Sequence, residues 1–274
     1  MQSVHSDISS EVSEGFLAVD CGNTRLKATW MPEAGEYVTA WFASDDAEGI
    51  VAFAEAHDAR RGAMASVGHV DSRLVETLRN ALHEDFLLVT PSTVMPVALD
   101  YADATTLGVD RKATAVAAAM LWPGESVIVA DAGTALTVDV VSDGRFAGGN
   151  ISPGLSMRFE ALHRYTARLP LVRASEWHGQ LPLFGGSTHD AILAGVCQGM
   201  LGELQRYVSM GARQYGATRL VLTGGDAPML LHWWRESLHS EDSSTPSNNI
   251  EIDYDPHLLA KGLRAIYMHH ENEI

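Results

Sequence analysis

Two stretches of this chain share one pattern, in which an apolar run ends in aspartate, a small residue, glycine and then a polar residue. "LAVDCGNT" occupies residues 17–24 and "VIVADAGT" residues 127–134, so Asp20 and Asp131 stand 111 positions apart. The glycine permits a sharp turn with positive φ and leaves backbone N–H groups accessible to an oxyanion. One such turn is typical of a β-hairpin with an Asx turn. Its repetition indicates a duplicated domain.

The segments that follow these two turns also repeat in order. The periodicity of the first half predicts strands at "FLAVDCG", "RLKATWM", "YVTAWFA", "GAMASV" and "DFLLVT", and helices at "DDAEGIVAFAEAH", "DSRLVETLRNALH" and "DRKATAVAAAML". In the second half it predicts strands at "SVIVADAG", "ALTVDVV", "GRFAGG", "RLVLTGG" and "NIEIDY". Helices are expected at "PGLSMRFEALHRY", over 190–215, at "APMLLHWWRESL" and from Pro256 on.

This order predicts an α/β protein made of two similar domains. We expect a polar N-terminal extension at 1–15, a first domain at 16–123 and a second domain at 124–274. The polar stretch "SEDSSTPSNN" at 240–249 is expected to be a surface loop.

The composition excludes several classes of partner. Lys and Arg number 19 against 35 Asp and Glu, a formal net charge of -16 that repels nucleic acid and anionic membrane surfaces. The longest apolar run, "AVAAAMLW", is too short to span a membrane. The two cysteines, Cys21 and Cys197, provide no disulfide framework or metal knuckle, and the polar start lacks the features of a signal peptide. We therefore expect a cytoplasmic protein.

The residues of the two turns suit a polyphosphate. Beside Gly22, Asn23 and Thr24 add hydrogen-bond donors, and Lys27 can reach a phosphate oxygen as a point charge. A carboxylate such as Asp20 repels phosphate unless a cation lies between them, which predicts Mg²⁺ held directly or through water. In the second turn Thr134 supplies a hydroxyl and Asp131 a second carboxylate.

A third strand ends in "LTGGDAP" at 222–228. Its small residues would let a flat ring approach the backbone, and Asp226 can cap the following helix.

Six blocks in order resemble the type III pantothenate kinases, which belong to the actin-like and sugar-kinase-like superfamily of duplicated ribonuclease H-like domains. These blocks are "DCGNT", "GVDR", "DAGTALTVD", "GGNISPG", "TGGD" and "DPHLLAKGL", and the resemblance runs from about residue 16 to 268. It implies ATP-dependent phosphorylation of pantothenate to 4'-phosphopantothenate, the first step of coenzyme A biosynthesis.

The resemblance also implies roles for individual residues. Asp110 would be the general base that accepts the proton of the primary hydroxyl of pantothenate; taken alone, it would be interpreted as a helix N-cap. Arg111 would contact pantothenate or the moving phosphoryl group, and its alternative is an exposed position on a helix.

Four further residues would line the pantothenate pocket. Gly108 and Val109 belong to the same block as Asp110, Tyr101 precedes it, and Thr188 lies in "GGSTHDA". An aromatic side chain in an exposed loop is the alternative for Tyr101, and a helix cap is the alternative for Thr188.

Cofactors and partners follow from the same resemblance. It implies ATP with Mg²⁺, a monovalent cation (K⁺ or NH₄⁺) on Asp131, and a homodimer whose partner subunit completes the acceptor pocket near "GGNISPGLSMRFEALHRYTARLP". The residues alone do not distinguish K⁺ from Mg²⁺ at Asp131.

Two other functions remain open at this stage. One is a different small-molecule kinase or an acetate-kinase-like phosphotransferase on the same fold. The other is a non-catalytic, actin-like nucleotide-binding regulator, which would have no need of a base at Asp110. The sequence contains no P-loop, dinucleotide-binding fingerprint, HExxH or GxSxG motif.

Overall fold

The computed structural model describes residues 15–22, 25–66, 71–83, 85–177, 181–240 and 250–272. Asn23, Thr24, nearly all of the expected extension and nearly all of the expected loop at 240–249 lie outside the described residues. By its contacts the chain divides into two units, one up to Thr90 and one from Pro91 on.

The first unit is built on a five-stranded sheet in the order β3-β2-β1-β4-β5. β1 runs antiparallel to β2, and β2 to β3, whereas β4 is parallel to both β1 and β5. The bounds of these strands are β1 (Phe16–Cys21), β2 (Arg25–Met31), β3 (Val38–Ala43), β4 (Gly62–Ser66) and β5 (Phe86–Val89).

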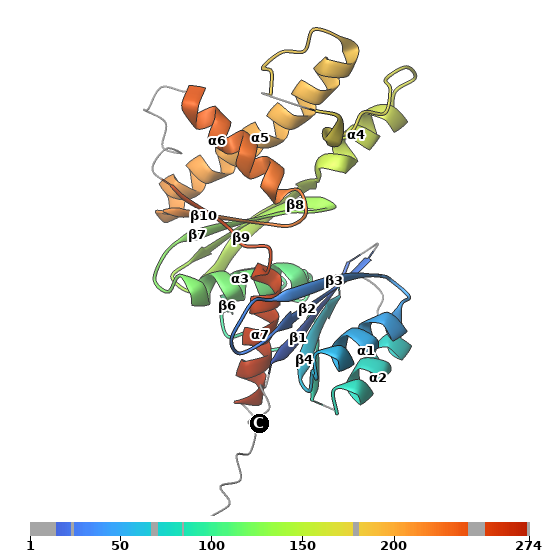
Figure 1. Cartoon of the computed structure of the whole chain (residues 1–274). Coiled ribbons are helices and arrows are strands. Elements are labelled where there is room, and N and C mark those ends of the chain that lie inside the picture. The colour runs from blue at the N-terminus through green and yellow to red at the C-terminus, as the bar shows by residue number, and fades with distance from the viewer. Residues whose placement is uncertain are drawn as a thin grey trace, which may run out of the picture. The chain divides into compact units, whose positions relative to one another are not determined.

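Two helices, α1 (Ala47–Ala56) and α2 (Ser72–Ala81), cover one face of this sheet (Figure 1). Each begins after an aspartate whose side chain accepts a backbone N–H of the first turn: Asp46 from Gly49 and Asp71 from Arg73, each at 2.9 Å. The apolar face of α2 packs through Leu74 and Leu78 against β1.

The second unit contains a six-stranded sheet in the order β11-β10-β7-β8-β9-β6. Here too the first three strands, β7, β8 and β9, are antiparallel neighbours, and β10 and β11 run parallel to β7. The bounds are β6 (Ala98–Leu99), β7 (Val127–Ala132), β8 (Ala135–Ser142), β9 (Arg145–Pro153), β10 (Arg219–Thr223) and β11 (Glu251–Tyr254).

Helices cover both faces of the second sheet (Figure 1). Ile128 and Leu220 point to the core shared with α4, α5 and α6, and Val129 and Val221 to the core shared with α3 and α7. The bounds are α3 (Val109–Leu121), α4 (Leu155–Arg164), a 3-10 turn η1 (Ala174–Glu176), α5 (Thr188–Tyr215), α6 (Ala227–Ser240) and α7 (Leu258–Glu271).

The two sheets confirm the predicted duplication. Each contains three antiparallel strands followed by two parallel ones, with the first strand at the centre of those five. Asp20 and Asp131 occupy the same place, the fifth residue of β1 and of β7. The predicted α/β fold class and the expected helices and strands are therefore confirmed, and only the short β6 and η1 were not foreseen.

Helix α3 explains why contacts divide the chain at Thr90, earlier than the boundary expected after residue 123. It follows β5 as α7 follows β11, so by sequence it ends the first copy of the repeat. By contact it belongs to the second unit, where it packs on α7, β7, β8 and β9. Its alanines are buried because neighbours surround it. The boundary after residue 123 stays a prediction about the repeat.

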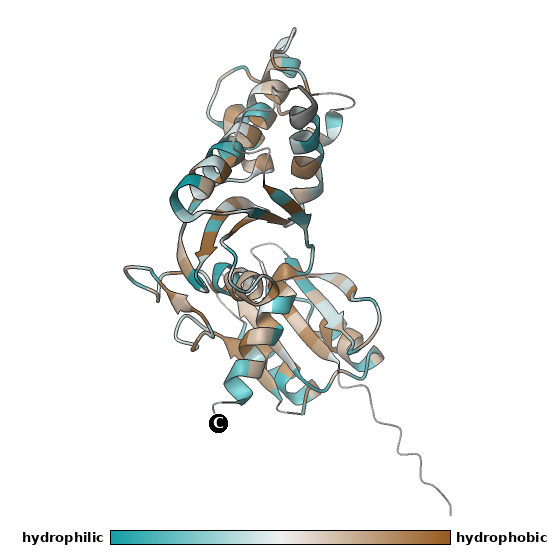
Figure 2. Cartoon of the chain, turned by 90° about the vertical axis from the view of Figure 1, so that its left-hand side faces the viewer, coloured by the Kyte–Doolittle hydropathy of each residue, from teal (hydrophilic) through white to brown (hydrophobic). Residues whose placement is uncertain are grey.

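Hydrophobic residues concentrate along the strands of both sheets, whereas the helices also carry many hydrophilic positions (Figure 2). Among the described residues, no helix combines the length and apolar character needed to cross a membrane.

The closest approach of α3 and α7 occurs at Gly262. A Cβ there would lie 1.8 Å from the carbonyl oxygen of Ala113. We therefore expect Gly262→Ala to lower the free energy of unfolding by about 1–3 kcal/mol, as overpacking does in tight cores. Chemical denaturation measures this.

Gly199→Ala is the matched control, because that helical glycine has open space around its Cβ position. It should raise the free energy of unfolding by roughly 0.5–1 kcal/mol. Equal stability of the two variants would contradict the tight contact between α3 and α7.

Candidate active site

The first predicted phosphate turn joins β1 to β2. Gly22 donates its N–H to the carbonyl of Arg25 at 3.1 Å, which closes the turn, and Asp20 pairs across the hairpin with Lys27. The ammonium of Lys27 lies 5.5 Å from the ring centre of Trp41 on the neighbouring strand. The hairpin therefore brings one carboxylate and one ammonium to the end of a buried strand.

The second turn joins β7 to β8 and is packed closely by glycines from other elements. Gly133 donates to the carbonyl of Ala135 at 3.0 Å, and Thr134 is exposed. A Cβ on Gly154 would lie 2.2 Å from the Gly133 carbonyl oxygen. Gly224, at φ +91, has the carboxylate of Asp131 2.4 Å from its Cβ position. Only glycine fits there, so the sequence keeps space around the Asp131 carboxylate.

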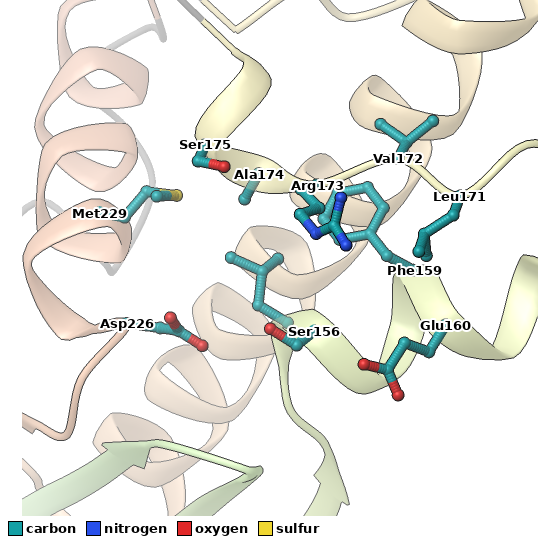
Figure 3. Close-up of a pocket in the computed structure, with 11 residues that line it drawn as sticks. Ser156, Phe159, Glu160, Leu171, Val172, Arg173, Ala174, Ser175, Asp226 and Met229 are labelled. Atoms are coloured by element: carbon teal, nitrogen blue, oxygen red, sulfur yellow. The ribbon is translucent and has the colours of Figure 1, made fainter.

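A pocket of about 250 Å³ is lined by the first half of α4, by residues 171–175 and by Asp226 and Met229 at the start of α6 (Figure 3). Asp226 is tied to the turn because its N–H donates to the Ala132 carbonyl at 2.9 Å, and its carboxylate points into the pocket (Figure 3). Burial raises the pKa of that carboxyl. The other lining residues are Leu155, Ser156, Phe159, Glu160, Leu171, Val172, Arg173, Ala174, Ser175 and Met229.

The predicted general base, Asp110, lies in the first turn of α3. The N-cap of this helix is Gly108, so the alternative of an Asp110 N-cap is wrong. The Asp110 carboxylate accepts the backbone N–H of Arg111 at 2.8 Å. Within the described part of the chain, no cationic side chain forms an ion pair with Asp110.

Arg111 is not the exposed helix residue of the alternative interpretation. It is 5% exposed, and its Nε donates to both carboxylate oxygens of Asp139, at 3.0 and 3.1 Å. Burial would lower the pKa of Arg111, but hydrogen bonds and charge from Asp139, with a smaller contribution from Tyr101, raise it. The guanidinium stays protonated.

The structure brings Tyr101 to the same place. Its ring meets Phe146 edge-on at 5.8 Å, and Phe146 also lies 5.5 Å below the guanidinium of Arg111. The structure thus brings Tyr101 to Arg111, which follows Gly108 and Asp110 in the chain. Val109 is 3% exposed, so only its backbone is available to a ligand.

The start of α5 holds the last predicted substrate residue. Ser187, not Thr188, is the N-cap, and its hydroxyl accepts the N–H of Asp190 at 3.1 Å. His189 joins this turn to η1 because its Nε2 lies 3.0 Å from the Glu176 carboxylate. Hydrogen bonds to Glu176 and then Asp190 raise the pKa of His189. Thr188 is left exposed.

Sequence reasoning missed the buried charges of this region. Asp139 is 1% exposed and Lys112 is also 1% exposed, with its ammonium donating to the Pro91 carbonyl at 2.8 Å. In the sequence, the pattern that could have indicated burial is a charged residue among apolar ones: Asp139 in "LTVDVV" and Lys112 in "DRKATAV". Arg173, in the pocket, had no such signal.

The carboxylate oxygens of Asp20 and Asp131 are chemically suitable ligands for Mg²⁺ and K⁺. Among the described residues no group of three or more His, Cys, Asp or Glu could hold a metal. A single carboxylate such as Asp20 suits Mg²⁺ that is otherwise bound by phosphates and water. At the second turn the Asp131 carboxylate would supply one oxygen ligand to a cation.

Comparison with known proteins gives a consistent result. A sequence model of the type III pantothenate kinase family matches residues 16–210. A type III pantothenate kinase of Porphyromonas gingivalis is 37% identical over 223 residues, covering 81% of this chain and 91% of the relative. Another from Phocaeicola vulgatus is 38% identical over 215 residues, covering 77% and 86%.

Solved structures share the fold at low sequence identity. A putative Baf family transcriptional activator from Campylobacter jejuni superimposes with a TM-score of 0.57 at 23% identity, covering 93% of this chain and 99% of that one. A putative N-acetylmannosamine kinase from Listeria monocytogenes gives 0.51 at 14% identity, covering 94% and 99%. These likenesses show the fold alone.

The two cysteines should differ in reactivity. Cys197 on α5 is fully buried, and burial raises the pKa of its thiol to about 12, whereas Cys21 is partly exposed. At pH 8 the reactive thiolate fraction of Cys197 is on the order of a thousandfold below that of an ordinary cysteine. A thiol reagent should therefore modify at most Cys21 in the folded protein and both cysteines in denaturant. Native labelling that falls in Cys197→Ala would contradict this.

Proposed function

Since the chain belongs to the type III pantothenate kinase family and phosphorylates pantothenate with ATP in coenzyme A biosynthesis, we propose that Asp110 is its general base. The observation that carries this role is the placement of Asp110 in the first turn of α3, beside a guanidinium that is bound by another carboxylate. The Asp110 carboxylate is thus available to accept the proton of the primary hydroxyl as that oxygen attacks the γ-phosphate. Phosphoryl transfer depends mainly on such positioning and on charge neutralisation.

The two hairpin turns would bind the phosphates of ATP. In this proposal Gly22, Asn23 and Thr24 donate hydrogen bonds, Lys27 supplies a positive charge, and Thr134 donates its hydroxyl from the second turn. Support comes from the equivalent places of Asp20 and Asp131 in the two sheets. Mg²⁺, carried with ATP and held by Asp20, would neutralise phosphate charge.

The nucleoside would occupy the pocket of the second unit. Its apolar side chains, which include Phe159, Leu171 and Met229, suit a flat base, and the Asp226 carboxylate can accept a ribose hydroxyl (Figure 3). A monovalent cation, K⁺ or NH₄⁺, would lie against Asp131 and offset phosphate charge at a turn that has no Lys or Arg.

Pantothenate would be bound beside Asp110. Tyr101, Arg111 and the backbone of Gly108 and Val109 form one group with it. Thr188 would contact the substrate from the exposed start of α5.

We also propose that the enzyme is a homodimer and that the partner subunit completes the acceptor pocket. Large apolar side chains are strongly exposed before and after α4, Ile151 at 65% on β9 and Tyr165 at 80% at the end of the helix. Phe184, in the segment before α5, is 85% exposed. Exposed apolar groups of this size are typical of protein interfaces when they lie together.

Asp110→Asn tests the base. Removing the proton acceptor should lower kcat by on the order of a hundredfold or more, while the dissociation constant for ATP stays within about twofold. A coupled assay for ADP with pantothenate, run with and without K⁺, measures kcat, and calorimetry measures ATP binding.

Asp143→Asn is the matched control, because Asp143 is exposed in the β8–β9 hairpin at φ +52, where asparagine is equally tolerated. It should retain wild-type kinetics. A wild-type protein that binds ATP and phosphorylates nothing would instead favour the nucleotide-binding regulator.

Met157→Lys tests the dimer. Met157 lies on α4 and is 44% exposed, so a charge there should disrupt an apolar interface. We expect a monomer in sedimentation velocity and a rise in KM for pantothenate on the order of tenfold. Met268→Lys, 42% exposed on α7, is the control and should leave mass and KM unchanged. A dimeric, fully active Met157→Lys would place the interface elsewhere.

A further inference from the structure

Asp139 is a buried acid to which the proposed mechanism gives no role. It lies on β8 opposite Gly149 of β9 and is 1% exposed. A charge in such a place is costly unless it is paired. The Asp139 carboxylate therefore requires a partner, and Arg111 is that partner.

The contact between the two is bidentate. Nε of Arg111 donates to both Asp139 oxygens at 3.0 and 3.1 Å, and Nη2 donates to Oδ1 as well. Gly149 makes room for the pair, since a Cβ there would lie 1.8 Å from Asp139 Oδ1 and 2.6 Å from Arg111 Nη2. The second glycine of "GGN", Gly149, thus leaves the space that this ion pair occupies.

A second carboxylate stands next to Arg111 in the chain. Asp110 precedes it in the chain and already accepts its backbone N–H. Asp110 is also close enough to act on Asp139: burial first, and then the charge of Asp110, raise the pKa of Asp139 to about 6 against the lowering effect of Arg111. Asp110 and Asp139 are thus the two carboxylates near Arg111, and its guanidinium is hydrogen-bonded to Asp139.

We propose that Asp139 is a positioning residue that holds the Arg111 guanidinium away from Asp110, so that the Asp110 carboxylate remains available as a proton acceptor. This inference rests on the proposed role of Asp110. A carboxylate that is paired with a guanidinium is a weaker base, because the positive charge stabilises its ionised form. Without Asp139, the buried Arg111 would turn to the adjacent carboxylate of Asp110.

The test compares Asp139→Asn with the double variant Asp139→Asn/Arg111→Gln. Asp139→Asn should lower kcat by about tenfold or more, with a smaller change in KM for ATP. The double variant removes the guanidinium that captures Asp110, so its kcat should be severalfold higher than that of Asp139→Asn. Its KM for pantothenate should exceed the wild-type value, because Arg111 also borders the substrate.

Rescue by removing Arg111 separates positioning from a structural role, which would make the double variant no faster than Asp139→Asn. Asp253→Asn is the control, since Asp253 also pairs with an arginine of its sheet, Arg219, and should leave kcat unchanged. A kcat of Asp139→Asn within twofold of wild type, or a double variant no faster than the single one, would overturn the inference.

If Asp139→Asn does not fold, which an absence of cooperative melting would show, the kcat of Gly149→Ala tests the inference instead. Its methyl group would displace the ion pair without changing any charge, and it should lower kcat with little change in KM for ATP. An unchanged kcat would overturn the inference.

Asp110→Asn, assayed in parallel, separates the role of Asp110 from the role of Asp139. If Asp110→Asn is inactive while Asp139→Asn and Gly149→Ala have normal kcat, only the role of Asp139 fails. If Asp110→Asn is fully active, the proposed base itself fails.

Discussion

The structure depends on one constraint that each sheet repeats: the central strand is buried along most of its length and ends in a carboxylate beside a glycine turn. Asp20 and Asp131 are the fifth residues of β1 and β7, after four buried positions. The apolar part of each strand fixes its place in the sheet. Gly22 and Gly133 close the turns through their N–H groups, and the positive φ expected for them is not found. The carboxylate is therefore held at the edge of a rigid core, where a cation-bound phosphate can approach it.

Helix α3 carries the residue that we propose as the general base. Its first turn carries Asp110, and the two residues that follow Asp110 are both buried charges: Arg111 reaches Asp139 of β8, and Lys112 reaches the carbonyl of Pro91. Pro91 is the first residue of the second unit, and burial lowers the pKa of Lys112. The first turn of α3 is thus anchored to the sheet and to Pro91, which restricts the position of Asp110, the proposed base.

The sequence was sufficient to predict the helices, the strands and their duplication, because hydrophobic periodicity and turn residues are local properties. It was also sufficient for the family, because six blocks occur in order. It did not predict that Asp139 pairs with Arg111 or that Gly149 makes room for them. The first contact joins residues 28 positions apart, and the second depends on the register of β8 and β9. Local patterns likewise suggested an N-cap at Asp110 and at Thr188, whereas the backbone places the caps at Gly108 and Ser187.

The net charge of the chain limits how the proposed site can attract ATP. A net charge of -16 opposes the approach of ATP, so attraction has to be local. Arg111 cannot provide all of it, because Asp139 already neutralises its guanidinium. Lys27 lies against Trp41 at the first turn, and the second turn has no basic residue. In the proposed function, backbone N–H groups and metal cations therefore supply most of the positive potential.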